Sequence, residues 1–387
     1  MARASESGGG PRRLVTRLGV LVAATVVALG AAEVVVRVAF PAPEPLAPYH
    51  IRVFHEGAWH TLDADSHGLL MAPSTDPVLA GLHGVFHPNL HFKLCYDARD
   101  EWARAQFDAD GCVDVRINSE HLRGPLRPRE KPADVFRIAL VGDSFTFGHG
   151  VRYEDTWGAR VEEALGGGDV AVEVLNFAVS GYDADEVALM LRHRALQWQP
   201  DRLLYGFFLN DLLVADDAED PRDRVHDSVN ENAEHDAVFG APRGLAKHSL
   251  LWDLVRRRLA QRRVHDLTTG IYGRAGTPGT PHFEGWRAAL ADMAAAASEA
   301  GVPLDVVVFP EIIQLDDSHE LLDVYAAVTA AAEELGLGTV SIFEAWQGLE
   351  ARDLWVHATD HHPNDEAHAW AAMRVEDHLR KAEPRLR

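Results

Sequence analysis

The sequence predicts an α/β domain with a parallel sheet over residues 132–387, and three observations lead to this prediction. Short aliphatic runs alternate with longer amphipathic stretches, which is typical of parallel strands joined by crossover helices. The first run ends directly in Gly142-Asp143-Ser144. Polar residues also follow later runs, and parallel sheets bind their ligands at the carboxyl ends of the strands. We therefore expect a functional site at that edge of the sheet.

The expected strands are aliphatic runs that are too short for helices. They cover residues 136–141, 170–175, 203–208, 304–309 and 338–343. The stretches between them predict helices at residues 157–165, 183–198, 283–300 and 321–335, and a last helix follows Pro363. In the second of these stretches, Val187, Leu191 and Trp198 share one face at helical spacing.

Residues 212–281 interrupt this alternation, and we interpret them as an insertion on the carboxyl side of the sheet. The segment is first acidic, then basic and amphipathic over residues 251–263, then rich in Gly and Pro. Two interpretations stay open, a lid or wall beside the site and a solvated excursion with one docking helix. Its arginines are interpreted as a solvated helix face rather than a site for an anionic substrate: Arg256, Arg257, Arg258, Arg262 and Arg263.

The N-terminus predicts a cytoplasmic tail at residues 1–13 and a membrane segment at residues 14–40. The segment is free of charge from residue 18 to residue 32, and Glu33 and Arg37 can pair near its outer end. The arginines of the tail predict that the rest of the chain lies outside the cytoplasm, in the periplasm or the extracellular space. The alternative is a signal peptide cleaved near residues 30–32, which would release a secreted protein. We favour the uncleaved anchor.

Residues 41–131 predict a small, β-rich accessory region after a proline-rich linker. The two cysteines of the chain, Cys95 and Cys112, both lie in it. A disulfide is the expectation for a region outside the cytoplasm, with two reduced core cysteines as the alternative. The formal net charge of −22 argues against a nucleic-acid partner, which would require a basic face.

Ser144 is the candidate nucleophile, because it follows a predicted buried strand and begins a turn into a helix. Backbone N–H groups at such a turn can stabilise an oxyanion. Further polar blocks follow in chain order: Asn176 and Gly181, then Asn210-Asp211, then Asp360-His361-His362-Pro363-Asn364. Together with Gly142-Asp143-Ser144, these blocks resemble the SGNH hydrolases, also called GDSL esterases/lipases.

The resemblance covers residues 132–210 and 302–379, and it implies a flavodoxin-like three-layer α/β/α sandwich, the SGNH hydrolase fold. It also implies a site in which His362 is the general base and Asp360 orients it. The N–H groups of Ser144 and Gly181 and the amide of Asn210 would form the oxyanion hole. No cofactor and no metal are implied, and the C-terminal histidines lack a recognised metal-ligand frame.

One feature departs from the family pattern, because Asp360 precedes His362 by two residues where the family usually has Asp-x-x-His. Related sugar O-acetyltransferases of the alginate-modifying type have the shorter spacing. The spacing therefore shifts weight towards acyl transfer without deciding between transfer and hydrolysis.

The function expected from these residues is an extracytoplasmic serine esterase that cleaves an acyl ester of a carbohydrate or lipid through an acyl-serine intermediate. Its expected partners are an acylated small molecule or polysaccharide as substrate and, through the N-terminal helix, a membrane. One alternative is an O-acetyltransferase that modifies an envelope or exported polysaccharide. A second alternative is a non-catalytic envelope binding protein.

Overall fold

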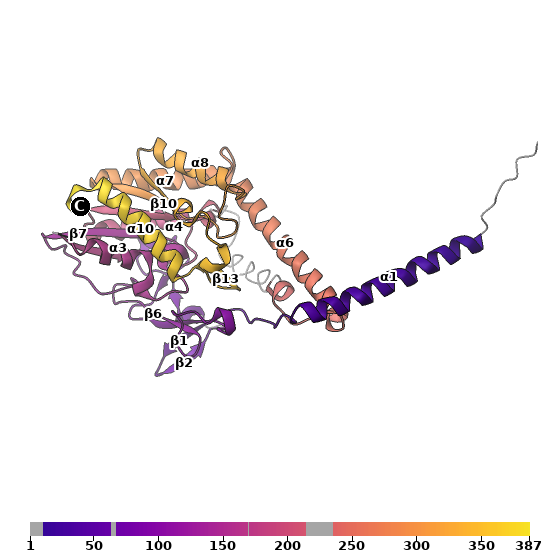
Figure 1. Ribbon diagram of the computed structural model, residues 1–387. Helices are drawn as coiled ribbons and strands as arrows, with labels where there is room; N and C mark the ends of the chain where they lie inside the picture. Colours follow the sequence, from indigo (N-terminus) through magenta and orange to yellow (C-terminus); the bar gives the residue numbers. More distant parts are fainter. Residues whose placement is uncertain (1–10, 63–66, 169, 214–234) are drawn as a thin grey trace, which may run out of the picture. The chain divides into compact units, whose positions relative to one another are not determined.

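The computed structural model describes residues 11–62, 67–168, 170–213 and 235–387 (Figure 1). The chain divides into two compact units, which are described separately. The larger unit comprises Ala47–Ser228 and Asp266–Arg387, and the smaller comprises Met1–Leu46 and Val229–His265.

The larger unit is built on a five-stranded parallel sheet with the order β11-β10-β9-β7-β8. Its strands are β7 (Val135–Gly142), β8 (Ala171–Asn176), β9 (Arg202–Phe207), β10 (Leu304–Val308) and β11 (Gly338–Ser341). Counted along the chain, this is the flavodoxin-like order 2-1-3-4-5, whose switch point lies between the first and third strands. The predicted fold class is confirmed, and each predicted strand overlaps an observed one.

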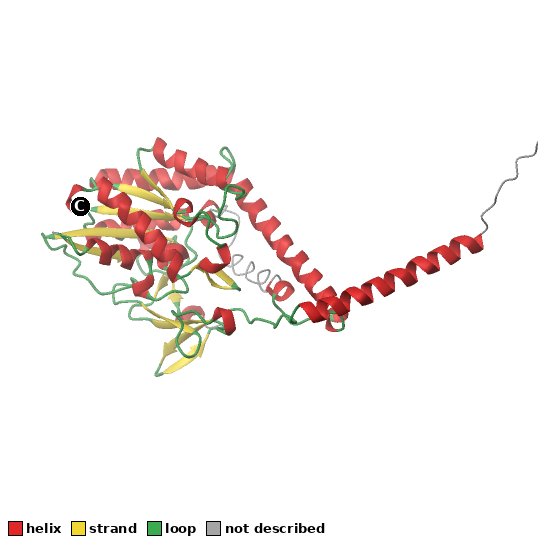
Figure 2. Cartoon of the chain, in the orientation of Figure 1, coloured by secondary structure: helices red, strands yellow, loops and turns green. Residues whose placement is uncertain are grey.

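Helices cover both faces of this sheet (Figure 2). They are α3 (Trp157–Leu165), α4 (Ala184–His193), α7 (Pro281–Ala300), α8 (Leu322–Glu334) and α10 (Asp365–Ala382). The helix α3 packs against α10, and α4 packs against α7. Buried aliphatic side chains of the strands fill the space between the layers, with Ile138, Leu204 and Val306 fully buried.

The predicted helix over residues 183–198 is shorter in the structure. Asp183 caps α4 in a capping box with Glu186, as the sequence pattern favours. The helix ends at His193, because Arg194 leaves the helical region with φ −125° and ψ −60°. A separate 3-10 turn, η5 (Ala195–Trp198), then brings Trp198 into the core.

The accessory region is β-rich, as predicted, and belongs to the same compact unit as the parallel sheet. It contains an antiparallel sheet with the order β2-β1-β5-β6 and a small pair of β3 with β4. The strands are β1 (His50–His55), β2 (Ala58–Thr61), β3 (Met71–Ala72), β4 (Val85–Phe86), β5 (His91–Cys95) and β6 (Cys112–Arg116). The predicted boundary at residues 131/132 stays a prediction.

The smaller unit contains α1 (Pro11–Ala39) and the first part of α6 (Leu250–Ala275). Within α1, Arg13–Ala39 is apolar and long enough to cross a membrane, with a mean hydropathy of 2.3. A helix was expected over the basic stretch at residues 251–263. The observed helix α6 continues well beyond it and includes Gly270 and Gly273. Residues 214–234 of the predicted insertion lie outside the described residues.

The structure joins Cys95 and Cys112 in a disulfide between the paired strands β5 and β6. We expect the variant Cys95→Ala/Cys112→Ala to melt roughly 6–12 °C below the wild type. A cross-link between residues 17 apart stabilises by about 3 kcal/mol in the chain-entropy model, and 1 kcal/mol corresponds to about 2–4 °C in a unit of this size. Thermal unfolding of the full chain in a mild detergent measures the difference. Reductant should lower the melting temperature of the wild type alone, and equal melting of both proteins would contradict the prediction.

Candidate active site

The candidate nucleophile Ser144 begins the one-turn helix α2 (Ser144–Phe147), directly after β7. The turn into α2 is tight. A Cβ atom on Gly142 would lie 2.6 Å from both the carbonyl oxygen of Gly206 and Oγ1 of Thr146, and its φ of +151° also favours glycine. A side chain at Gly206 would collide with Thr146 as well. The two glycines therefore let β7 end where Ser144 reaches the carboxyl edge of the sheet.

Asp143 holds this turn in place. Its carboxylate accepts hydrogen bonds from the backbone N–H of Phe145 at 2.9 Å and from Oγ of Ser144 at 3.4 Å. The side chain is buried, and burial raises its pKa to about 6. Asp143 therefore caps the helix that begins at Ser144.

A second polar residue, Asn176, supports the same turn from the end of β8. Its amide donates to the carbonyl oxygen of Thr146 at 2.9 Å and accepts from the N–H of Ala178 at 3.0 Å. Both contacts are to backbone groups. Asn176 therefore fixes α2 relative to the loop after β8.

The structure brings Ser144, His362 and Asp360 into one chain of hydrogen bonds. Nε2 of His362 lies 2.8 Å from Oγ of Ser144, although the two residues are 218 positions apart. Nδ1 of the same ring lies 2.5 Å from Oδ1 of Asp360, which also accepts from the backbone N–H of His362 at 3.1 Å. The geometry is that of a nucleophile, a base and an orienting carboxylate.

The short spacing between Asp360 and His362 has a structural explanation. Both lie in β13 (Asp360–Pro363), which pairs with β12 (Trp355–His357). Alternate residues of a strand point to the same side, so positions two apart can meet. The intervening His361 instead stacks on the ring of Trp355, with ring centroids 3.8 Å apart.

The charges of this pair favour each other. Burial alone would lower the pKa of His362, but the carboxylate of Asp360 outweighs burial and raises the pKa of His362 above its usual range. Burial would likewise raise the pKa of Asp360, but His362 holds it well below the ordinary value. Asp360 therefore stays ionised, and His362 is a stronger base than free histidine.

Two further residues reach this carboxylate that sequence reasoning missed. Tyr96 follows β5 in the accessory region, and its hydroxyl donates to Oδ2 of Asp360 at 2.7 Å in a buried hydrogen bond. Burial and the nearby carboxylate raise the pKa of Tyr96, so the hydroxyl keeps its proton and remains a donor. The sequence around Tyr96 has no motif that could have identified it.

The other missed residue is His149, which directly follows Gly148. Its ring centroid lies 4.4 Å from that of His362, and its Nε2 lies 3.5 Å from Oδ2 of Asp360. Burial lowers the pKa of His149 to about 3, so the ring is neutral near pH 7. Its place only five residues after Ser144 was a signal that could have identified it.

Arg123, also from the accessory region, holds the segment after Ser144. Its buried guanidinium donates to the carbonyl oxygens of Phe147 at 2.7 Å, Gly148 at 2.5 Å and Val151 at 2.5 Å. Burial lowers the pKa of Arg123 to about 10, which leaves it charged at neutral pH. The accessory region thus contacts both α2 and the residue that orients the candidate base.

The predicted oxyanion residues follow β8 and β9. Gly181 has φ +88°, and a Cβ atom there would meet only His83, at 3.8 Å. Asn210 lies in η6 (Leu209–Leu212), and its amide nitrogen donates to the carbonyl oxygen of Tyr182 at 3.3 Å. Asn210 is therefore held beside the loop that contains Gly181. Its Oδ1 atom is buried and has no hydrogen-bond partner among the described residues.

The next residue, Asp211, has a buried carboxylate that accepts from the N–H of Phe208 at 2.9 Å. Burial and the carboxylate of Asp143 raise the pKa of Asp211. The Tyr205 side chain also interacts with this carboxylate. Asp211 thus caps η6.

The other C-terminal histidines of the sequence cluster point elsewhere. Nε2 of His357 lies 3.1 Å from the carbonyl oxygen of Asp97, and Nδ1 of His368 accepts from the N–H of Trp157 at 3.2 Å. Among the described residues, ligand-type atoms of His149, Asp360 and His362 lie within 4.8 Å of one another. The atoms of His362 that could bind a metal are already engaged with Ser144 and Asp360.

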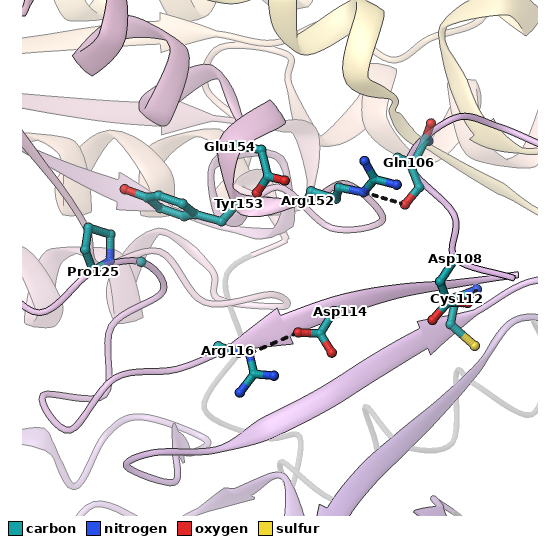
Figure 3. A pocket seen from close by; sticks show the side chains of 10 residues that line it. Gln106, Asp108, Cys112, Asp114, Arg116, Pro125, Arg152, Tyr153 and Glu154 are labelled. Atoms are coloured by element: carbon teal, nitrogen blue, oxygen red, sulfur yellow. Dashed lines mark hydrogen bonds and ion pairs between the residues drawn. The ribbon is translucent and has the colours of Figure 1, made fainter. Parts of the chain in front are cut away.

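A separate cavity of about 500 Å³ lies between β6 and the segment after α2 (Figure 3). Both of its arginines are engaged with neighbours. Nε of Arg152 donates to the carbonyl oxygen of Gln106 at 3.0 Å, and Nε of Arg116 donates to Asp114 at 3.2 Å. None of the residues that line the cavity belongs to the hydrogen-bonded chain that ends at Ser144.

Several solved structures resemble part of this chain at low sequence identity. They include TesA (16% identity, TM-score 0.39, 64% of this chain and 99% of that chain). A catalytic mutant of Axe2, an acetylxylan esterase from Geobacillus stearothermophilus, has 14% identity and a TM-score of 0.40 over 64% of this chain and 94% of that one. The psychrotrophic esterase EstA from Pseudoalteromonas sp. has 13% identity and a TM-score of 0.38 over 64% and 97%.

No curated protein matches the chain. The model of the GDSL-like Lipase/Acylhydrolase family matches residues 140–370, a range that includes Ser144, Gly181, Asn210, Asp360 and His362. This match spans more than half of the 387 residues. The chain therefore belongs to the GDSL-like lipase/acylhydrolase family of serine ester hydrolases.

Proposed function

We propose that the protein is a membrane-anchored, extracytoplasmic esterase that cleaves an acyl ester of a carbohydrate or lipid through an acyl intermediate on Ser144. The observation that carries the proposal is the 2.8 Å contact between Nε2 of His362 and Oγ of Ser144. This distance lies within reach for proton transfer between a nucleophile and its base. The buried carboxylate of Asp360 behind the ring supports the same assignment.

The reaction follows from these positions. Oγ of Ser144 attacks the ester carbonyl carbon while Nε2 of His362 takes the hydroxyl proton. The tetrahedral oxyanion is stabilised by the N–H groups of Ser144 and Gly181 and by the amide of Asn210. His362 then gives its proton to the leaving alkoxide and next activates a water molecule, which releases the acid from Ser144.

Asp360 and Tyr96 act through His362. The carboxylate fixes the ring so that Nε2 faces Ser144, and it stabilises the imidazolium that forms during the attack. The Tyr96 hydroxyl donates a hydrogen bond to the other carboxylate oxygen of Asp360 and thereby fixes the orientation of the carboxylate. Tyr96 is therefore a positioning residue of this site.

The proposed location rests on the first helix. The apolar length of α1 supports an anchor, and the arginines that precede it favour a cytoplasmic N-terminus. An uncleaved anchor would keep the enzyme at the membrane, whereas cleavage near residues 30–32 would release it. The mass of the protein recovered from membranes distinguishes these outcomes. An uncleaved protein has the full-length mass, whereas cleavage removes most of α1.

Transfer of the acyl group to a carbohydrate hydroxyl is the second candidate function, favoured by the spacing of Asp360 and His362. In a transferase, an acceptor hydroxyl would replace water in the second step. Product analysis with an acceptor sugar present separates the two, because a transferase yields acylated sugar and an esterase yields free acid.

We expect Ser144→Ala to lower the hydrolysis of p-nitrophenyl acetate by at least about 10³-fold, because the variant lacks the nucleophile. The full chain in a mild detergent serves as the enzyme. Ser298→Ala, which removes an exposed hydroxyl on α7, is the matched control and should keep wild-type activity. Equal rates for the wild type and Ser144→Ala would sink the assignment of Ser144.

The pH profile tests the base. Activity requires neutral His362, and its raised pKa places the midpoint of the rise in kcat/KM above about 6.5. Without the carboxylate the pKa of His362 falls, so Asp360→Asn should move the midpoint to lower pH and lower the rate by at least about 10²-fold. Asp143, with a pKa of about 6, titrates nearby, so the shift on Asp360→Asn is the deciding measurement. An unchanged midpoint would count against His362.

The variant Tyr96→Phe tests the positioning role, since it removes one hydrogen bond and keeps the ring. Loss of this donor leaves the carboxylate of Asp360 more basic, which should raise the pKa of His362. We expect a several-fold lower kcat, little change in KM and a small upward shift of the pH midpoint. A purely structural role predicts an unshifted midpoint. Tyr272→Phe, outside the hydrogen-bonded chain, is the control.

A further inference from the structure

The carboxylate of Glu33 in α1 caps the N-terminus of α6. It accepts hydrogen bonds from Oγ of Ser249 at 2.8 Å and from the backbone N–H groups of Leu250 at 2.8 Å and Leu251 at 3.0 Å. The first N–H groups of a helix have no partner within the helix, and negative charge is favourable there. Ser249 caps the helix as well, since its Oγ accepts from the N–H of Trp252 at 3.0 Å, and Glu33 of α1 adds a second cap to the same turn.

A second contact joins the same two helices. Arg37 pairs with Glu33 at 2.6 Å and also donates to the carbonyl oxygen of His248 at 3.0 Å. Both partners belong to the smaller unit. The start of α6 is therefore fixed to the single turn of α1 between Glu33 and Arg37.

The position of Arg37 along α1 sets the level of this junction. The stretch from residue 18 to residue 37 is about 20 residues long, on the order of 30 Å, which is the thickness of the apolar core of a bilayer. If α1 crosses the membrane with its arginine-flanked start inside, Arg37 reaches the outer interface. The start of α6 then lies at the same level.

The first half of α6 exposes an apolar face that suits this position. Trp252, Val255 and Leu259 are 48%, 39% and 61% exposed, and their spacing of three and four residues places them on one side of the helix. Tryptophan is enriched where membrane and water meet. These three side chains are not buried within the smaller unit, so their apolar surface is open to a lipid surface.

The arginines of α6 divide into two groups. Arg257 is held by Asp253 at 3.0 Å and by the carbonyl oxygens of Val238 at 2.5 Å and Gly240 at 2.8 Å. Arg256 likewise pairs with Asp253, at 2.8 Å. The interpretation of all five arginines as a solvated face was therefore wrong for these two, because they fix the segment that precedes α6.

The remaining arginines, Arg258, Arg262 and Arg263, have exposed side chains. They make a basic surface on a chain whose formal net charge is −22. A helix with an apolar face bearing Trp and Leu, flanked by exposed Arg, is the pattern of a helix that lies in a membrane interface and attracts anionic lipids.

We propose that residues 250–265 of α6 lie on the outer surface of the membrane that α1 crosses. Trp252, Val255 and Leu259 enter the boundary between headgroups and acyl chains, and the exposed arginines contact anionic headgroups. The inference rests on the proposed anchoring by α1. The partner is the lipid surface itself, and the Glu33 cap holds the helix at its level.

Depth-dependent quenching tests this. Single cysteines are introduced by Leu259→Cys on the apolar face, by Gln261→Cys on the opposite face and by Val27→Cys within α1. Each full chain carries an environment-sensitive fluorophore at the new cysteine, because the native cysteines are bonded to each other. The chains are reconstituted into phosphatidylcholine vesicles containing 30% phosphatidylglycerol and lipids with a nitroxide on the acyl chain.

We expect strong quenching at position 27, clear quenching at position 259 and at least about threefold less at position 261. Quenching at 27 with equal signals at 259 and 261 would overturn the surface-helix proposal and leave the anchor standing. Absence of quenching at 27 would overturn the anchor, and with it this inference.

A charge variant tests the lipid class. Arg258→Gln/Arg262→Gln/Arg263→Gln should lower the quenching at position 259 at least about twofold in anionic vesicles and leave it nearly unchanged in pure phosphatidylcholine. Position 27 serves as the internal reference, since its quenching should not respond. An equal response in both lipids would overturn the contact with anionic headgroups.

Discussion

The site depends on one chain of hydrogen bonds that runs from buried Tyr96 and Asp360 through half-buried His362 to Ser144. Its members come from the accessory sheet, from the C-terminal hairpin of β12 and β13, and from the end of β7. Each group is satisfied by the next, and the low dielectric of the interior strengthens the buried contact between Tyr96 and Asp360. These hydrogen bonds therefore fix three segments that are far apart in sequence, and they also set the basicity of His362.

The turn at the end of β7 imposes the second constraint. Gly142 and Gly206 leave room for the side chain of Thr146. The side chains of Asp143 and Asn176 form hydrogen bonds with the backbone around Ser144. Arg123 binds three carbonyl oxygens just after Ser144. Both terminal nitrogens of this buried guanidinium donate to carbonyl oxygens, while its Nε has no hydrogen-bond partner among the described residues. The segment that carries the nucleophile is thus held from both sides, by the sheet and by the accessory region.

Much of this arrangement could be predicted from the sequence. The strands were visible as aliphatic runs, and Ser144 and Asn210 follow two of them, as an open parallel sheet requires. His362 was visible only as part of a motif near the C-terminus. The early end of α4 could not be predicted. The hydrophobic pattern of the sequence stays helical past Arg194, whereas the backbone leaves the helical conformation there. Tyr96 was equally hidden, since its role depends on a contact across 264 positions. The spacing of Asp360 and His362 was visible but was interpreted without the strand that explains it.

The contacts of Tyr96 and Arg123 define how small a working version of this enzyme can be. A fragment that starts at residue 132 keeps every strand of the parallel sheet, yet it leaves Asp360 without its tyrosine donor and strips three carbonyl oxygens of their guanidinium. Newly exposed apolar surface of α2, where Phe147 packs against Phe86, would add to that loss. A minimal version must therefore begin upstream of β5, so gene fusions or domain exchanges in this protein should treat the antiparallel sheet as part of the catalytic body.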